Sequence, residues 1–305
     1  MISVIIPLYN KEQQITETLK SVLDQSFERF EIVIVDDGST DTSVEKILMF
    51  RDPRIRLVRQ ENAGVSAARN RGVKEARFDF VAFLDADDRW KPNYLQTQYE
   101  LSQKYPQCDV FACNYEFVHQ DGSVHPTIIR KLKITGQDGI LDNYFEVASC
   151  SHPPICSISV MVRKAALQQI GGFPVGIRSG EDLLTWAKLA CQHQIAYNKI
   201  STSLFYAEGY NRSDNPKRLP DVKDQVGHEL IKLSKKYSYP KISYYISHWY
   251  RMRASVYMRF GMKKNCIKEV LKSLKFNPLN TKVYLYIILV TIPKKLKYII
   301  LSKIK

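Results

Sequence analysis

The sequence predicts an α/β fold in which a doubly wound, mostly parallel sheet is followed by a basic helical region. Short β-branched runs alternate with longer segments of helical period over residues 1–90, and these runs are apolar throughout, as in strands buried on both faces. From Pro216 onward, 21 Lys and Arg stand against 4 Asp and Glu (+17), whereas residues 1–215 have 24 against 27 (−3). The chain of 305 residues is long enough for a full enzyme core.

Each element is expected from its local pattern. The strands in the first part are SVIIPL (3–8), EIVIVDD (31–37), IRLVRQ (55–60) and FVAFL (80–84). Helices are expected over 12–24, from 41 and over 63–76, where polar segments of helical period separate the strands. The middle is mixed, with a strand over 108–119, a strand and a helix start within 149–167, and a glycine-rich turn before an amphipathic helix within 170–193.

These patterns predict a catalytic domain over 1–215 and a basic helical region over 216–305 that contacts a membrane or mediates oligomerisation. So basic a region suggests an anionic partner, either nucleic acid or a membrane surface, although a solvated helical face is the alternative. The apolar run VYLYIILVTI (283–292) is about half of the ~20 residues that cross a bilayer. It could be buried, or lie flat in the membrane interface.

Six cysteines form no C-x-x-C pair and no Cys/His cluster at zinc spacing, and the N-terminus MISVIIPLYN lacks the basic start of an export signal. Free thiols in a reducing compartment are therefore expected. The sequence predicts a cytoplasmic protein, with the inner face of the cytoplasmic membrane as a candidate place of peripheral attachment.

Polar residues follow the predicted strands, where doubly wound sheets bind ligands. Asp85, Asp87 and Asp88 follow the fourth strand, and such close carboxylates repel one another unless a cation or hydrogen-bond donors neutralise them. Mg²⁺ or Mn²⁺ would neutralise them and could also bridge a diphosphate. The D-x-D spacing lets Asp85 and Asp87 face one ligand, although alone it also fits caps, turns and solvated loop charge.

Two common nucleotide motifs are absent. No G-x-G-x-x-G follows the first strand, which argues against a dinucleotide cofactor, and no G-x-x-x-x-G-K-[ST] supports a P-loop. VDDGST alone fits a helix N-terminus, since Asp, Ser and Thr are good caps. A nucleotide diphosphate held by a metal fits the strand ends better than one held by a glycine loop.

The motifs IPLYN, VDDGST, ENAGVSAARN, FLDADD and GGF followed by GED, in that order, resemble a family two inverting glycosyltransferase of the GT-A fold, of the type that builds bacterial surface glycans. The resemblance covers about residues 1–205. It implies transfer of a sugar from a nucleotide-diphosphate donor, with UDP as the expected nucleotide, to a hydroxyl of a glycan or lipid-linked glycan. It also implies inversion of the anomeric configuration and dependence on Mn²⁺ or Mg²⁺.

The resemblance implies a donor site built from five residues. Pro7 and Tyr9 match positions that line the nucleotide base, with Tyr9 stacking on it, and Asp37 matches the acceptor for a ring N–H. Arg69 matches a residue near the base or the diphosphate. Asp85 would contact the ribose or the metal.

The resemblance also implies the metal ligand and the catalytic carboxylates. Asp87 would ligate the metal that bridges the two phosphates, and Asp182 of GED matches the base that deprotonates the acceptor. Glu181 would orient the acceptor or share that task. Many relatives carry a histidine motif after this acidic helix, whereas this chain has FYAEGYNRSDN, in which Arg212 could take its place.

Two other functions remain as alternatives. A nucleotidyltransferase would share the sheet and the metal, but it normally has a glycine- and arginine-rich loop after the first strand, and IPLYNKEQQ lacks one. A nucleic-acid-binding protein would explain the basic region, yet the acidic strand ends would repel phosphates without a metal. We therefore expect no nucleic-acid partner.

Overall fold

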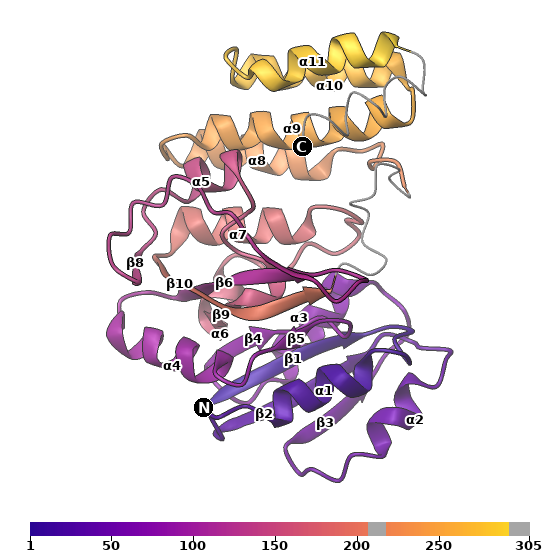
Figure 1. Cartoon of the computed structure of the whole chain (residues 1–305), viewed down its shortest axis with the longest axis vertical. Helices are drawn as coiled ribbons and strands as arrows, with labels where there is room; N and C mark the ends of the chain where they lie inside the picture. Colours follow the sequence, from indigo (N-terminus) through magenta and orange to yellow (C-terminus); the bar gives the residue numbers. More distant parts are fainter. Residues whose placement is uncertain (207–217, 293–305) are drawn as a thin grey trace. The chain divides into compact units, whose positions relative to one another are not determined.

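The structure is a computed structural model, and it describes residues 1–206 and 218–292 (Figure 1). The chain divides into two compact units, Met1–Glu208 and Gly209–Lys305. The domain boundary expected between residues 215 and 216 lies outside the described residues.

The first unit contains, within the described residues, one ten-stranded sheet with the order β3-β2-β1-β4-β9-β6-β10-β5, while β7 pairs with β6 and β8 with β10. The strands are β1 (Ile2–Leu8), β2 (Phe30–Asp36), β3 (Ile55–Arg59), β4 (Phe80–Phe83), β5 (Arg89–Trp90), β6 (Val110–Val118), β7 (Val124–Pro126), β8 (Asp138–Ile140), β9 (Val160–Arg163) and β10 (Ile195–Tyr206). Strands β1 to β4 run parallel, as do β6 and β10, whereas β9 is antiparallel to both of its neighbours. The predicted mostly parallel α/β sheet is confirmed.

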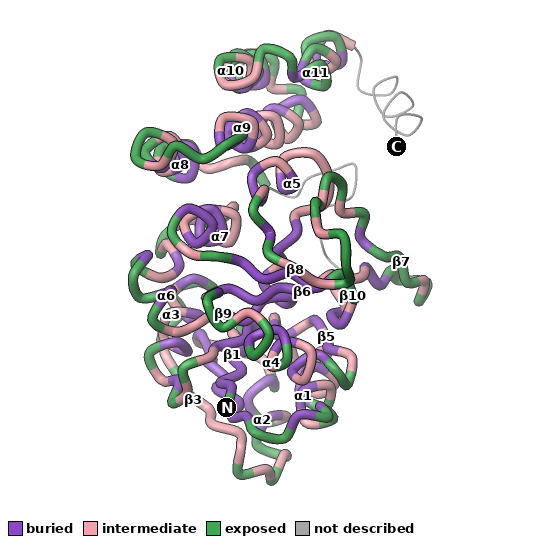
Figure 2. The backbone as a smooth tube through the Cα atoms, turned by 90° about the vertical axis from the view of Figure 1, so that its left-hand side faces the viewer, coloured by how far each residue is buried: buried purple, intermediate pink, exposed green. Residues whose placement is uncertain are grey.

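Helices cover both faces of this sheet (Figures 1 and 2). The helices of the first unit are α1 (Ile15–Leu23), α2 (Ser43–Leu48), α3 (Val65–Glu75), α4 (Tyr94–Lys104), α5 (Tyr144–Cys150), α6 (Lys164–Gln169) and α7 (Glu181–Gln192). Alternate β1 side chains point to opposite faces. Val4 and Ile6 join the core formed with α1 and α4, while Ile5 faces α3. Burial on both faces explains why these strands are continuously apolar.

Helix α3 lies unusually close to β1 at Gly72. A Cβ built on Gly72 would stand 2.3 Å from Cγ2 of Ile5, whose side chain is fully buried in the sheet. We expect Gly72→Ala to lower the free energy of unfolding by roughly 1–2 kcal/mol, because the clash outweighs the ~1 kcal/mol gain in helix propensity. Urea denaturation measures it. Lys74→Ala, on the exposed side of α3, is the control, and a Gly72→Ala protein as stable as wild type would contradict this packing.

The second unit is helical in its described part, as the basic C-terminal sequence predicts. It comprises α8 (Gln225–Lys236), α9 (Ile242–Arg259), α10 (Lys263–Phe276) and α11 (Thr281–Thr291). Its core joins side chains of α9, α10 and α11, among them Met258, Val270 and Leu289. Across residues 1–206 and 218–292, helices that combine the length and the apolar character needed to cross a bilayer are not found.

Candidate active site

The loops that follow β1 and β2 are hydrogen-bonded to each other. Asn10, with φ of 50°, accepts a hydrogen bond from the backbone N–H of Thr40 at 2.8 Å, and its own N–H donates to Ser39 Oγ at 3.1 Å. A left-handed backbone is more accessible to Asn than to most side chains. The two strand-end loops therefore form one surface at the carboxyl edge of the sheet.

Lys11 connects this surface to the aspartates that follow β4. Its Nζ lies 2.5 Å from Oδ2 of Asp87, and both side chains are about one third exposed. Asp88 is buried, and its Oδ1 accepts a hydrogen bond from the backbone N–H of Tyr206 at 2.7 Å. Burial, together with the negative charges of Asp87 and Asp85, raises the pKa of Asp88 well above its ordinary value. Asp85 and Asp87 therefore disfavour the ionised form of Asp88.

Arg69 of α3 links Asp85 to the start of α7. Its Nη2 donates to Asp85 Oδ1 at 2.7 Å, and its Nη1 lies 3.9 Å from Glu181 Oε1. The guanidinium is buried and stands over the ring of Phe173 at 5.3 Å. Asn70, the next residue, accepts from the N–H of Phe173 and donates to its carbonyl, both at 2.8 Å. The GGF turn and α3 therefore hold Arg69 between two carboxylates that are 96 residues apart in sequence (85 to 181).

The two carboxylates that begin α7 share an unusual electrostatic environment. Burial and the charge of Asp182 raise the pKa of Glu181 to about 7, against the opposing effect of Arg69. Burial also raises the pKa of Asp182, while Arg69 and the Leu183 N–H, which donates to Asp182 Oδ1 at 2.7 Å, favour its ionised form. Two interacting carboxyls of this kind titrate as a pair, so the pair retains one proton up to nearly neutral pH.

The raised pKa of Glu181 predicts a pH-dependent stability. Because the folded state binds a proton more tightly than the unfolded chain, this contribution is present below pH about 4.5 and is lost as the pH rises through about 7. Wild type should lose up to about 3 kcal/mol relative to Glu181→Gln across this window, since the amide does not titrate. Denaturant unfolding of both metal-free proteins between pH 4.5 and 8 measures the difference, and a constant difference would contradict it.

The β4 end also allows a test of whether a divalent cation fits. Among the residues that the structure describes, no set of three or more His, Cys, Asp or Glu side chains is arranged to hold a metal by itself. Asp87 is nevertheless accessible, and a cation beside it would offset the repulsion among the carboxylates that raises the pKa of Asp88. Mg²⁺ and Mn²⁺ often bind through one or two carboxylates and take their remaining ligands from substrate phosphates and water. The residues therefore fit a metal that arrives with a diphosphate.

The three residues expected at the nucleotide base lie on the same edge, but no interaction joins them to Arg69 in the described structure. Pro7 is in β1, and Tyr9 follows it with 48% of its surface exposed. Asp37 is buried, and its carboxylate accepts hydrogen bonds from Gln60 Nε2 and from the N–H groups of Ala63 and Gly64. Asp37 thus positions the loop before α3 and has one remaining acceptor site for a ligand.

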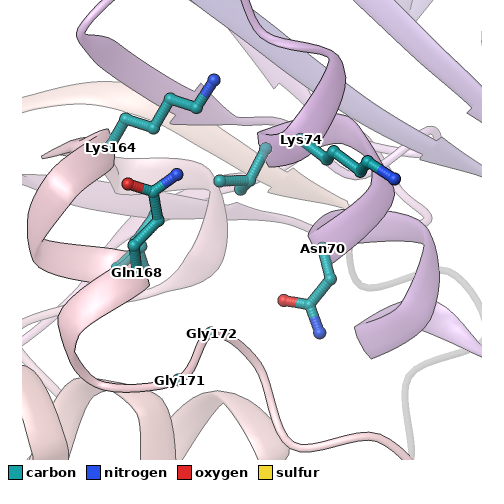
Figure 3. Close-up of a pocket in the computed structure, with 8 residues that line it drawn as sticks. Asn70, Lys74, Lys164, Gln168, Gly171 and Gly172 are labelled. Atoms are coloured by element: carbon teal, nitrogen blue, oxygen red, sulfur yellow. The ribbon is translucent and has the colours of Figure 1, made fainter.

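A separate pocket of about 310 Å³ lies between α3, α6 and the Gly171–Gly172 turn (Figure 3). Asn70, Lys74, Lys164 and Gln168 are among its lining residues. It contains none of the residues that the sequence predicts for the site. The strand-end carboxylates and this pocket are therefore different places on the first unit.

Two contacts of the site are absent from the sequence predictions. Lys11 is the ion-pair partner of Asp87, and its only sequence signal is a basic residue directly after IPLYN. Arg69 contacts Asp85 and Glu181 directly, whereas the resemblance places it near the base or the diphosphate. Arg212 lies outside the described residues.

Residues 3–170 match the model of the family "Glycosyl transferase family 2". The chain is 34% identical over 200 residues to the putative teichuronic acid biosynthesis glycosyltransferase TuaG of Bacillus subtilis, which covers 65% of this chain and 75% of TuaG. It is 38% identical over 125 residues to the UDP-Glc:alpha-D-GlcNAc-diphosphoundecaprenol beta-1,3-glucosyltransferase WfgD of Escherichia coli. This match covers 41% of this chain and 49% of WfgD. Other relatives are longer, and the chain spans only 27% of glycosyltransferase GlyA of Streptococcus pneumoniae.

Solved structures show the same fold. S. aureus TarS 1–349 in complex with UDP-GlcNAc has a TM-score of 0.61 at 20% identity, covering 90% of this chain and 80% of that one. The mannosyltransferase PcManGT from Pyrobaculum calidifontis, in complex with GDP-Man and Mn²⁺, has a TM-score of 0.59 at 17% identity, covering 96% and 86%. The fold is that of the GT-A glycosyltransferases, as the motifs predict. With more than half of its length matched by the family model, the chain belongs to glycosyl transferase family 2.

Proposed function

We propose that the protein transfers a sugar from a UDP-sugar to a hydroxyl of a glycan or lipid-linked glycan, with inversion at the anomeric carbon. The observation that carries the proposal is the position of Arg69. It pairs with Asp85, which is proposed to bind the donor, and lies near Glu181, the neighbour of the proposed general base. A site that combines donor binding with a nearby carboxylate pair suits direct displacement by an acceptor hydroxyl. The UDP-GlcNAc complex of TarS and the UDP-glucose named for WfgD support UDP as the nucleotide.

In this mechanism Asp182 is the general base. It accepts the proton of the acceptor hydroxyl, and the oxygen attacks the anomeric carbon opposite the leaving UDP, so a single displacement inverts the configuration. The Leu183 N–H donates to Asp182, which favours the ionised form against the effect of burial and orients the carboxylate. Glu181 orients the acceptor, and Arg69 holds Glu181 and Asp85 in place. Tyr9 stacks on the nucleotide base, with Pro7 beside it, and Asp37 accepts a hydrogen bond from the N–H of the base ring.

Asp87 is the proposed ligand of Mn²⁺ or Mg²⁺, and such an ion supplies charge neutralisation to a leaving diphosphate. Asp85, at the same edge of the sheet, would contact the ribose or the metal. In the described structure Asp87 forms an ion pair with Lys11. The Mn²⁺ in the complex of PcManGT supports a divalent metal as the cofactor.

The acceptor is proposed from the relatives. TuaG is named for teichuronic acid biosynthesis, and the printed name of WfgD specifies an acceptor linked through a diphosphate to undecaprenol. Both support an acceptor in the synthesis of a bacterial surface glycan. Within the described residues, nothing specifically favours a nucleotidyltransferase or a nucleic-acid-binding protein over this function.

The proposal is tested by incubating the full chain and Mn²⁺ with a panel of UDP-sugars and a diphosphate-linked polyprenyl N-acetylglucosamine. We expect acceptor-dependent UDP release with one or a few of the sugars, and NMR of the product should show the anomeric configuration opposite to that of the donor. A product that keeps the donor configuration would contradict the inversion. Release from GDP-sugars alone would contradict the choice of UDP.

A further inference from the structure

The outer faces of α10 and α11 combine exposed apolar side chains with lysines. In α10, the buried residues Cys266, Val270 and Ser273 face the core that α10 shares with α9 and α11. The exposed face of α10 carries Ile267 and Leu271, and 62% of the surface of Leu271 is accessible. Three exposed lysines lie on that face at helical spacing, namely Lys264, Lys268 and Lys275.

Helix α11 exposes several large apolar side chains. Val283, Leu289 and Val290 are buried in the shared core, whereas Tyr284, Ile287 and Ile288 are exposed, the last with 59% of its surface accessible. Leu279, in the turn before α11, is 81% exposed. Leaving several large apolar side chains in water is unfavourable, so this face indicates a binding surface. Figure 2 shows α10 and α11 side by side, with exposed residues on each.

The segment that contains α10 and α11 is strongly basic. Between Lys263 and Ile292 there are six lysines and one acidic residue, Glu269. Glu269 is buried and paired with Arg253 at 3.0 Å and with Lys272 at 2.9 Å. The other five lysines are exposed, and no acidic side chain of the segment opposes them.

We infer that the exposed faces of α10 and α11, here called the α10–α11 surface, dock on an anionic lipid bilayer. An interfacial helix buries its apolar face at the level of the headgroups while lysines contact anionic lipids. Nucleic acid would satisfy the lysines but leave Leu271, Ile287 and Ile288 in water. A lipid surface satisfies both kinds of side chain. At 11 residues, α11 is suited to lie in the interface and is too short to cross the bilayer.

This inference goes beyond the proposed transfer reaction and does not depend on it. Vesicle binding is measured without donor or acceptor, and UDP binding is measured separately on the same proteins. A protein that binds UDP but no vesicles would contradict only the docking surface. One that binds vesicles but no nucleotide would contradict only the proposed function.

The experiment is co-sedimentation of the full chain with vesicles of phosphatidylcholine, or of an equal mixture with phosphatidylglycerol. We expect binding to the anionic vesicles that weakens at high salt. The triple variant Lys264→Gln/Lys268→Gln/Lys275→Gln should bind roughly a hundredfold more weakly, given the usual contribution of each lysine near an anionic membrane. Ile287→Ser/Ile288→Ser should also weaken binding, at unchanged net charge.

The matched control removes the same charge from α8. Its exposed side chains are all polar, and Lys232→Gln/Lys235→Gln/Lys236→Gln should retain most of the vesicle binding. An equal loss in this control would overturn the α10–α11 surface, because binding would then follow net charge alone. Two further results would overturn the lipid assignment if the protein does not bind vesicles. One is binding to single-stranded DNA that is lost in the α10 triple variant. The other is self-association that is lost in Ile287→Ser/Ile288→Ser.

Discussion

Replacing Asp182 with asparagine is expected to lower kcat by about a thousandfold, within the range that a general base contributes. The amide cannot accept the proton of the acceptor hydroxyl. Its oxygen can still accept the hydrogen bond that the Leu183 N–H donates to Asp182 at 2.7 Å, so the helix start should persist. Steady-state kinetics with a saturating UDP-sugar measures the change, and the KM for the donor should hardly move.

Two variants make this result interpretable. Glu181→Gln should reduce turnover less than Asp182→Asn, because Glu181 is proposed to orient the acceptor and not to take its proton. Asp121→Asn, in the exposed turn before β7, controls for the loss of one carboxylate. If Asp182→Asn turns over at the wild-type rate while Glu181→Gln is inactive, the base has been assigned to the wrong carboxylate.

Replacing Asp87 with asparagine is expected to lower metal-stimulated turnover by about a thousandfold, since an ion at the leaving diphosphate contributes several kcal/mol. The same change should remove the increase in melting temperature that Mn²⁺ adds to UDP binding, because a ligand stabilises the state that it binds. The melting temperature without ligands should change little, because the Asp87 side chain is partly exposed.

Lys11→Met is the companion variant. It leaves the Asp87 carboxylate in place but removes the ammonium that lies 2.5 Å from it. Because a cation and this ammonium compete for one carboxylate, we expect Lys11→Met to bind Mn²⁺ more tightly than wild type in direct titrations without nucleotide. Unchanged Mn²⁺ affinity in Lys11→Met, together with Mn²⁺-stimulated turnover in Asp87→Asn, would place the metal elsewhere.

Much of the fold could be predicted from local pattern. Strands β1, β2 and β4 are mostly apolar because both faces of the sheet are covered there, and the ends of β1 to β4 differ from the predicted ones by one residue or so. Strand β10 (Ile195–Tyr206) was not predicted, although it pairs with β5, β6 and β8. Its centre carries Lys199, Ser201 and Thr202, and register shifts interrupt its pairing with β6, so neither apolar continuity nor strict alternation marks it.

The location of the candidate site could be predicted from the topology of the sheet. Carboxyl ends of parallel strands meet at one edge, so the residues after β1, β2 and β4 could be placed there from the sequence. The contact of Lys11 with Asp87 could not be predicted, because the two residues are 76 positions apart and their contact depends on the path of the loop after β1. The position of Arg69 between Asp85 and Glu181 depends on how the GGF turn packs on α3, which no local pattern encodes.

The central claim is that the strand-end site binds a UDP donor through a metal at Asp87. Calorimetric titration of UDP into the full chain tests it most directly, with Mn²⁺ and with EDTA, and with GDP as the comparison. We predict binding of UDP that weakens at least tenfold in EDTA and in Asp87→Asn, and weaker binding of GDP. A folded protein that binds no UDP in the presence of Mn²⁺, or binds it equally well in EDTA, would contradict the account.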